Sequence, residues 1–198
     1  MKISINNKRG WDINPAPFFI LYNMAKMCLT KLNGNITVGC TINPVGVKNL
    51  YIMHVEDTTF NVNELIVQGA TFASGATVIL VEGYKQNIQV TASMLSMDAS
   101  AKMNYSVSFK LQRSITGAHS KLRSLLTGKF YVMAEYNDGS NMVMGCTSPL
   151  ECSGIDWDSN ANSGLATITL ACPEGSAGDY FRFANATALG QIKAKVGV

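Results

Sequence analysis

The residues of this chain that are best suited to nucleophilic chemistry are its two histidines and five cysteines. A thiol becomes a useful nucleophile when an imidazole within hydrogen-bonding distance takes up its proton. His54 lies inside an apolar run, where a hydrogen-bonded structural imidazole is the usual arrangement, and His119 begins a predicted exposed helix. We therefore predict that the chain is not an enzyme, and we rank a Cys/His hydrolase last among the functions considered.

The cysteines give no framework for a disulfide scaffold or a zinc site. Their number is odd, and no Cys-x-x-Cys pair occurs among Cys28, Cys40, Cys146, Cys152 and Cys172. Cys146 and Cys152 are close enough in sequence to bridge across a turn. We favour buried free thiols over a bridge.

Segment Asp156–Asn162 carries oxygen-bearing side chains at alternate positions, which is the opening pattern of a calcium loop. Ala161, however, stands where the sharp turn of such a loop needs glycine, and Thr167 stands where a bidentate glutamate should complete the shell. A polar turn is therefore the favoured interpretation. The chain also has no phosphate-binding glycine loop and no Gly-x-Ser-x-Gly elbow, so we predict no metal and no cofactor.

The elements that would position these residues are mostly strands. Large apolar residues occupy every second position of Tyr105–Gln112, which predicts a half-buried strand. A short amphipathic helix is predicted over Ala118–Thr127, with Gly128 as a left-handed stop. The apolar face of this helix would hold Leu122, Leu125 and Leu126.

A hairpin is predicted next, because Asp-Gly in the turn Asn137–Ser140 tolerates positive φ and lies between the apolar runs Lys129–Tyr136 and Met142–Met144. Further short strands are predicted at 50–55, 65–67, 77–81, 88–92 and 165–171, and residues 180–183 begin the last ordered piece. Gly69–Gly75 is either a loop or a hairpin between subunits. The sequence thus predicts a mainly β fold, either a sandwich or a barrel.

An apolar set with helical spacing follows Asn14-Pro15 and includes Phe18, Leu21 and Tyr22. The segment is too short and too interrupted by lysines to cross a membrane. It is either an arm that docks on a neighbouring subunit, which we favour, or a helix packed on its own domain. We divide the chain into an N-terminal arm at 1–35, a β-rich domain at 36–192 and a short C-terminal tail at 193–198.

Composition and charge indicate a surface partly covered by partners. Only 15% of the residues are charged while 47% are hydrophobic, and the net charge of +3 is too small to argue for nucleic-acid binding. Bases alone occur between Asp98 and Glu135, and acids alone from Glu135 until Arg182. Such blocks either form complementary faces for a head-to-tail ring contact or intermix on folding. The charged N-terminus does not resemble a signal peptide, which predicts assembly in the cytoplasm.

The predicted hairpin also carries a resemblance to a known family. The run Lys129-Phe-Tyr-Val-Met-Ala-Glu-Tyr-Asn-Asp-Gly-Ser-Asn-Met-Val-Met-Gly145, with the short leucine-bearing helix before it, resembles the strand–turn–strand signature of tail proteins from phages of Bacteroidetes-type hosts. The earlier run Cys40-Thr-Ile-Asn-Pro-Val-Gly-Val-Lys-Asn-Leu-Tyr-Ile-Met-His-Val-Glu-Asp57 is similar to the opening strand of the same proteins. The resemblance implies a tail-tube-like β-barrel with a short flanking helix, assembled into stacked rings around a lumen. The extra N-terminal segment before Cys40 departs from the pattern, so a repeating tube subunit and a specialised end ring both stay open.

We therefore predict a structural virion protein that forms a homo-oligomeric ring or tube in a phage tail, next to other tail or connector proteins. Viral DNA would pass through its channel transiently and without specific binding, and the protein would not insert into a membrane. The candidate subunit-interface residues are Phe18, Leu21, Tyr22, Lys110, Arg113, Tyr131, Met133 and Glu135, and the candidate lumen residues are Asp138, Glu151, Asp156 and Asp158. The alternatives are a head–tail connector or terminator ring and a β-sandwich adhesin or carbohydrate-binding module. The binding module would need an aromatic platform, for which Trp157, Tyr180 and Phe181 are the candidates.

Overall fold

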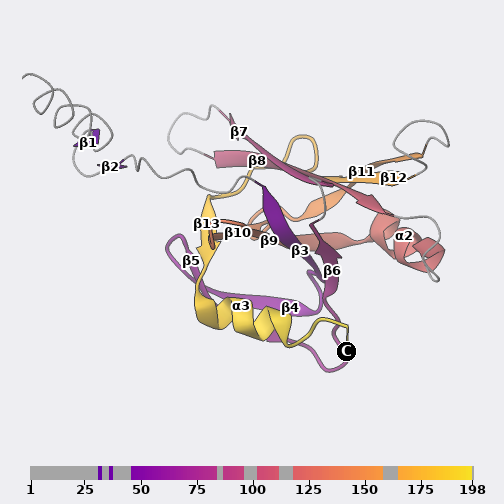
Figure 1. Ribbon diagram of the computed structural model, residues 1–198, viewed down its shortest axis with the longest axis horizontal. Coiled ribbons are helices and arrows are strands. Elements are labelled where there is room, and N and C mark those ends of the chain that lie inside the picture. The colour runs from indigo at the N-terminus through magenta and orange to yellow at the C-terminus, as the bar shows by residue number, and fades with distance from the viewer. Residues whose placement is uncertain are drawn as a thin grey trace, which may run out of the picture. The chain divides into compact units, whose positions relative to one another are not determined.

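The computed structural model (Figure 1) describes residues 31–32, 36–37, 46–83, 87–95, 102–111, 118–157 and 165–197. The chain divides into two units, Met1–Ile42 and Asn43–Val198. In the first unit, β1 (Lys31–Leu32) pairs with β2 (Ile36–Thr37). The predicted N-terminal helix lies outside the described residues.

The second unit is a single 11-stranded sheet with two helices among its described residues. Its elements are β3 (Val47–His54), β4 (Thr58–Asn63), β5 (Ile66–Phe72), β6 (Ile79–Glu82), β7 (Ile88–Leu95), β8 (Lys102–Leu111), α2 (Ala118–Thr127), β9 (Lys129–Tyr136), β10 (Asn141–Met144), β11 (Leu150–Trp157), β12 (Ala166–Ala171), β13 (Arg182–Ala184) and α3 (Ala186–Lys193). The predicted mainly β class is thereby confirmed.

Strand β9 is the branch point of this sheet. One side of β9 pairs with β3, which in turn pairs with β6. Its other side pairs with β10 over residues 132–135 and with β11 over residues 129–130. Two arms therefore leave β9, one through β10, β13 and β5 to β4 and the other through β11, β12 and β8 to β7. Among the described residues the arms end in different strands that do not pair with each other, so the sheet is open. Of the two predicted architectures, sandwich and barrel, the closed barrel is therefore wrong.

Both faces of β3 and β9 are buried, which explains why these strands read as nearly continuous apolar runs. One face contributes Leu50, Ile52 and Val132 to a core cluster with β8 and β12. The other face contributes Tyr51 and Met133 to a second cluster that includes α3. Figure 1 shows the two covers on opposite sides of β3 and β9, with β7, β8, β11 and β12 above them and α3, β4 and β5 below.

The segment around the hairpin follows the sequence-based prediction closely. In β8 the alternation holds, because Tyr105, Val107 and Phe109 are buried while their neighbours are less so. Helix α2 has the predicted bounds. Gly139 has φ +85°, and the Asp138 carboxylate accepts hydrogen bonds from the backbone N–H and hydroxyl of Ser140, so the turn is a local polar motif.

The C-terminal helix was not anticipated. The Asn185 side chain caps α3 by accepting the backbone N–H of Ala188 at 2.8 Å, and the buried residues Ala188 and Ile192 attach the helix to the second cluster. Residues 193–198 were set apart as a tail, but Lys193 is the last residue of α3 and Val196 forms a parallel bridge with Val78. Strands β4 and β11 were also not predicted as strands. None of the described helices is long and apolar enough to cross a membrane.

Gly128 ends α2 for a different reason than the one predicted. Its φ is not positive, so it is not a left-handed stop. A Cβ atom at this position would lie 2.4 Å from Cζ of Phe130 and 3.0 Å from Cε1 of His54, whose rings pack together with centroids 4.8 Å apart. Glycine is needed here because α2 meets β9 too closely for any side chain.

We expect Gly128→Ala to destabilise the protein by roughly 1–3 kcal/mol, because the fully buried Phe130 cannot move aside without disturbing the first core cluster. Gly190→Ala is the matched control. Gly190 lies inside α3 with no atom within 4 Å of a Cβ, so alanine there should stabilise by about 0.5–1 kcal/mol. Urea unfolding of both variants measures the two changes, and equal behaviour would contradict the steric explanation.

Candidate functional site

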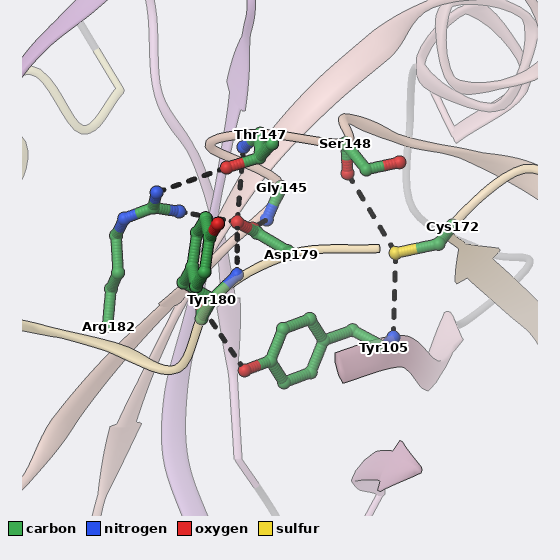
Figure 2. Close-up of polar contacts among 8 residues, drawn as sticks. All are labelled: Tyr105, Gly145, Thr147, Ser148, Cys172, Asp179, Tyr180 and Arg182. Carbon is green, nitrogen blue, oxygen red and sulfur yellow. Dashed lines mark hydrogen bonds and ion pairs between the residues drawn. The ribbon is translucent and has the colours of Figure 1, made fainter. Parts of the chain in front are cut away.

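A fully buried carboxylate, Asp179, organises one end of the sheet (Figure 2). Its oxygens accept backbone N–H groups from Gly145 at 2.7 Å, Thr147 at 3.2 Å and Tyr180 at 2.7 Å, and they form an ion pair with Arg182. We call these five residues the Asp179 cluster. A charge without solvent contact is tolerated only with such a set of donors, so the cluster fixes the backbone around it.

The backbone of Asp179 adds a further connection to β8. Met103 donates its N–H to the carbonyl of Asp179 at 2.7 Å, and Asp179 donates its own to the carbonyl of Met103 at 2.8 Å. The Arg182 guanidinium donates to the Thr147 hydroxyl at 3.0 Å and lies 5.2 Å from the centroid of the Tyr180 ring. The cluster therefore joins β8, the β10–β11 connection and the segment that enters β13.

Neutral side chains complete the surroundings of the cluster, as Figure 2 shows. The Tyr105 hydroxyl donates to the carbonyl of Tyr180 at 3.5 Å. The Cys172 thiol lies 3.5 Å from the Tyr105 backbone nitrogen, which donates to it, and 3.8 Å from the Ser148 carbonyl, which accepts from it. Burial, with the nearby Asp179 charge next, raises the pKa of Tyr105, and burial raises the pKa of Cys172. Both groups therefore stay protonated at neutral pH.

The segment held by Asp179 presents an exposed apolar surface. Phe181 and Phe183 are each 40% exposed, and their rings meet edge to face with centroids 4.8 Å apart. Phe183 is the register partner of Ile66, which is 50% exposed, and it donates its N–H to the carbonyl of Leu65, which is 51% exposed. We name these four residues, Leu65, Ile66, Phe181 and Phe183, the tip surface.

Strand β7 is an edge strand of the sheet. Among the described residues β7 pairs only with β8, over eight successive register pairs from Ile88 to Leu95 without a shift. Lys110 donates its N–H to the carbonyl of Asn87. Because backbone groups alternate in direction along an antiparallel strand, the N–H and C=O groups of residues 89, 91 and 93 point towards β8. The backbone groups of Ile88, Val90, Ala92 and Met94 consequently point away from the sheet.

Of the eight predicted interface residues, the structure describes Lys110, Tyr131, Met133 and Glu135. Phe18, Leu21, Tyr22 and Arg113 lie outside the described residues. Lys110 is partly buried in β8, and Tyr131 packs against Phe60 with ring centroids 5.0 Å apart. Met133 and Glu135 are buried inside the domain, which corrects their assignment to an interface.

The strands of the hairpin and the strand that includes Tyr105–Leu111 lie inside the sheet. Strand β8 lies between β12 and β7, β9 lies between β3 and its two neighbours, and β10 lies between β9 and β13. None of these strands has a free edge, so the sheet cannot be extended through the hairpin or through Tyr105–Gln112. For Gly69–Gly75 the sequence allows either a loop or an inter-subunit hairpin. Residues 69–72 instead belong to β5 and pair with β4 of the same chain.

Glu135 is instead the centre of a second polar cluster. Its carboxylate accepts hydrogen bonds from the Tyr51 hydroxyl at 2.8 Å, the Asn49 amide at 3.0 Å and the Lys193 ammonium at 2.9 Å, and Lys48 lies at 3.6 Å. Burial raises the pKa of this carboxyl, but the bonds from Asn49, Lys193 and Tyr51 outweigh that effect and lower the pKa to about 2. The cluster ties the end of α3 to β9.

The predicted lumen residues differ in their surroundings. Asp138 is exposed in the hairpin turn, where the bonds from Ser140 lower the pKa of its carboxyl. Glu151 forms an ion pair with Lys129 at 3.1 Å, Asp156 is exposed on β11, and Asp158 lies outside the described residues. One pair, Glu151–Lys129, joins the acidic block to the basic block, whereas Glu135 and Asp179 pair with Lys193 and Arg182, which follow both blocks in the sequence.

Three cysteines and part of the calcium-like segment considered for catalysis and ligand binding lie among the described residues. Cys146, Cys152 and Cys172 are free thiols, and burial, followed by the Asp179 charge, raises the pKa of Cys146 to about 12. Among the described residues no group of three or more His, Cys, Asp and Glu side chains could hold a metal ion, although most of the calcium-like segment lies outside them. Of the aromatic platform candidates, Trp157 is exposed on β11, whereas the guanidinium of Arg182 lies over the ring of Tyr180.

Sequence patterns did not predict the Asp179 cluster or the tip surface. Asp179 is separated from Gly145 by 34 residues, and nothing in its neighbourhood marks it as buried. The only available signal was the dense aromatic run Tyr180-Phe-Arg-Phe183 directly after it.

A scan of the chain against protein-family models and searches among curated proteins and solved structures gave no match.

We expect Asp179→Asn to destabilise the protein by about 3–5 kcal/mol, because the shape is kept while the largely buried Arg182 loses its counter-charge. Chemical denaturation with a fluorescence readout measures the change. Asp156→Asn, on an exposed position of β11, is the control and should change stability by less than about 0.5 kcal/mol. A small effect at Asp179 would show that the cluster is not needed to hold this end of the sheet.

The lowered pKa of Glu135 predicts a specific pH dependence. Because the folded-state pKa is depressed from 4.5 to about 2, its stabilisation is complete above pH 4.5 and is lost as the pH falls towards 2. The wild type should therefore exceed Glu135→Gln by on the order of 3 kcal/mol at neutral pH, and the difference should shrink over that window. Denaturant midpoints of both proteins from pH 7 to pH 2 test this, with Glu174→Gln on an exposed loop as the control.

Proposed function

We propose that this chain is a structural virion subunit that assembles into a homo-oligomeric ring or tube in a phage tail, around the channel through which DNA leaves. The observation that carries the proposal is the edge of β7 that has no partner strand among the described residues. A strand edge with unpaired backbone donors and acceptors is a ready template for another chain, and soluble monomers usually protect such edges.

The edge of β7 lacks the usual protective devices. The strand reads Ile-Gln-Val-Thr-Ala-Ser-Met-Leu and contains no charged residue and no proline. Its register with β8 has no bulge that would twist it away from a partner. The side chains of residues 91–94 are exposed, so no other described part of the chain covers this stretch of β7. An edge of this length and flatness fits strand addition.

The other edge strands are better protected. Strand β4 has a register shift at Asn61–Val62, which interrupts a regular ladder. Strand β6 has only four residues and ends in a charged one, Glu82. Among the described edge strands, β7 is therefore the one without such protection. Each subunit of a ring contacts two neighbours, and the edge of β7 suits one of these two contacts.

The tail assignment is supported by the two runs that resemble tail proteins. The run 129–145 forms β9, β10 and their turn, and the described part of the run 40–57 includes β3, which pairs with β9. The two runs are therefore neighbours at the centre of the sheet, as segments of one shared signature would be. A repeating tube subunit and an end ring both need the same kind of closing contact.

A channel for DNA should repel rather than hold the phosphate backbone, since every phosphate that is neutralised strengthens binding. Asp138 and Asp156 are the predicted lumen residues that are exposed, and no ion pair is found for either among the described residues. We assign these two side chains to the channel wall.

We expect Ala92→Pro to convert the assembly towards monomers. Proline removes the backbone N–H of Ala92, which points away from β8, and leaves the β7–β8 hydrogen bonds in place. Ala92→Val is the matched control, because it keeps the N–H and the strand preference. Sedimentation velocity and negative-stain electron microscopy over a range of protein and salt concentrations provide the measurement. A wild-type protein that stays a monodisperse monomer throughout would refute the proposed function.

A further inference from the structure

We infer that β7 pairs with β7 of a second copy of this chain, antiparallel and about a two-fold axis that passes beside Thr91. The inference rests on the proposed function and deepens it, because it names the partner of the strand edge on which that proposal depends. Unpaired backbone groups along a strand are satisfied by the backbone of another strand. The partner of β7 must therefore offer an open strand edge of similar length.

Among the described residues, a second copy offers such an edge only on its own β7. The sheet ends in β4, β6 and β7, but β4 has a register shift and β6 has only four residues. The part of β11 beyond Glu151 has no second partner strand, but its register shifts at Cys152–Gly154. On β5 the N–H of Ala70 is taken by the side chain of Gln191. The edge that matches β7 in length and regularity is therefore β7 itself.

The backbone of β7 determines how two copies can meet. Four residues carry N–H and C=O groups that point away from β8, namely Ile88, Val90, Ala92 and Met94. An antiparallel register centred on Thr91 places Val90 of one copy opposite Ala92 of the other. It also places Ile88 opposite Met94. This register alone brings all four residues of both copies into hydrogen-bonded pairs.

The same register also matches the two faces of the strand. The four outward-bonding residues are apolar, while the residues between them, Gln89, Thr91 and Ser93, are polar. Directly opposite residues share a face of the sheet, so antiparallel pairing sets apolar beside apolar and polar beside polar. Parallel pairing of the same two edges needs an axis along the strands, which would turn one copy over and set apolar beside polar.

The apolar face of β7 is covered at one end and open at the other. Ile88 belongs to the first core cluster and is 5% exposed, whereas Met94 is 69% exposed. Because the paired strands run in opposite directions, the open end of each copy would lie beside the covered end of the other. Each copy would thus bury apolar surface of β7 that it leaves in water by itself.

The charges around β7 also permit contact between identical strands. Groups near a two-fold axis meet their own equivalents, so a charged residue there would face a like charge. Strand β7 contains no charged residue. The bases of the neighbouring strand, Lys102 and Lys110, lie at or next to the ends of β8, whereas the register partner of Thr91 is Ser106. No like charges therefore meet at the proposed axis.

A two-fold contact determines how a larger assembly can be built. Such a contact closes on itself and joins two subunits only. A ring or tube that contains it therefore needs a second, different contact elsewhere on the subunit. The pairing of β7 would join the subunits two by two, so an assembly in which every β7 is paired has an even number of subunits.

Cysteine cross-linking of the full chain tests the inference. Opposite residues of a non-hydrogen-bonded pair have Cα atoms about 4.5 Å apart, which a disulfide can span. Thr91→Cys should therefore form a disulfide with its own copy under mild oxidation. Ser93→Cys is the matched control, because Ser93 is also exposed on the polar face but would lie opposite Gln89. It should cross-link with itself at least about tenfold more slowly. A mixture of Gln89→Cys and Ser93→Cys should cross-link, although neither does so alone.

Peptide mapping by mass spectrometry identifies each disulfide, with the wild type oxidised in parallel to account for the native cysteines. If wild type assembles but Thr91→Cys does not cross-link with itself, or Ser93→Cys does so equally fast, the inference fails while the proposed function stands. If Thr91→Cys cross-links as expected but wild type forms nothing larger than a dimer, the inference stands and the proposed function fails. A wild type that stays monomeric refutes both. Circular dichroism checks folding, and the mixture of Gln89→Cys and Ser93→Cys decides the matter if Thr91→Cys does not fold.

Discussion

The buried carboxylate of Asp179 is the interaction on which the arrangement of this domain depends most. A charge that is removed from water must be compensated by donors at fixed positions, and here the donors are backbone N–H groups of separate segments together with Arg182. The compensation therefore also determines where those segments lie. Because β8 exchanges backbone hydrogen bonds with the same residue, one side chain and its backbone join both arms of the sheet.

The branch at β9 makes such a connection necessary. Each arm leaves a different half of one strand, so hydrogen bonds along the ladder do not fix one arm relative to the other. The first core cluster fills the space between them, but apolar packing is not directional. The Asp179 cluster adds directional bonds at one end, and the Glu135 cluster does the same for α3, which covers the opposite face. Buried polar groups thus specify an arrangement that burial alone would leave less well defined.

Local patterns predicted the elements of this fold well and its long-range arrangement poorly. The alternation in β8, the bounds of α2 and the Asp-Gly hairpin depend on neighbours in sequence, so they could be read directly. Helix α3 was missed because its run Ala-Thr-Ala-Leu-Gly-Gln-Ile-Lys buries only Ala188 and Ile192 and contains a glycine. Glu135 was predicted as an interface residue, and its burial could not be inferred from the sequence because its partners, Tyr51 and Lys193, lie 84 and 58 residues away. The open sheet, the Asp179 cluster and the tip surface depend on contacts of the same long range.

The positions of the two polar clusters bear on how an assembling subunit can remain well folded. An open edge and an exposed apolar surface favour association, but a loosely held surface would lose much of the gain to ordering on contact. The tip surface avoids this loss because Phe181 and Phe183 follow within four residues of a carboxylate whose bonds fix the backbone. Strand β7 is likewise held by eight register pairs to β8, the strand that Asp179 contacts. The same buried residue therefore contacts both the segment that carries the tip surface and the strand that pairs with β7, so that folding fixes the backbone of the two together.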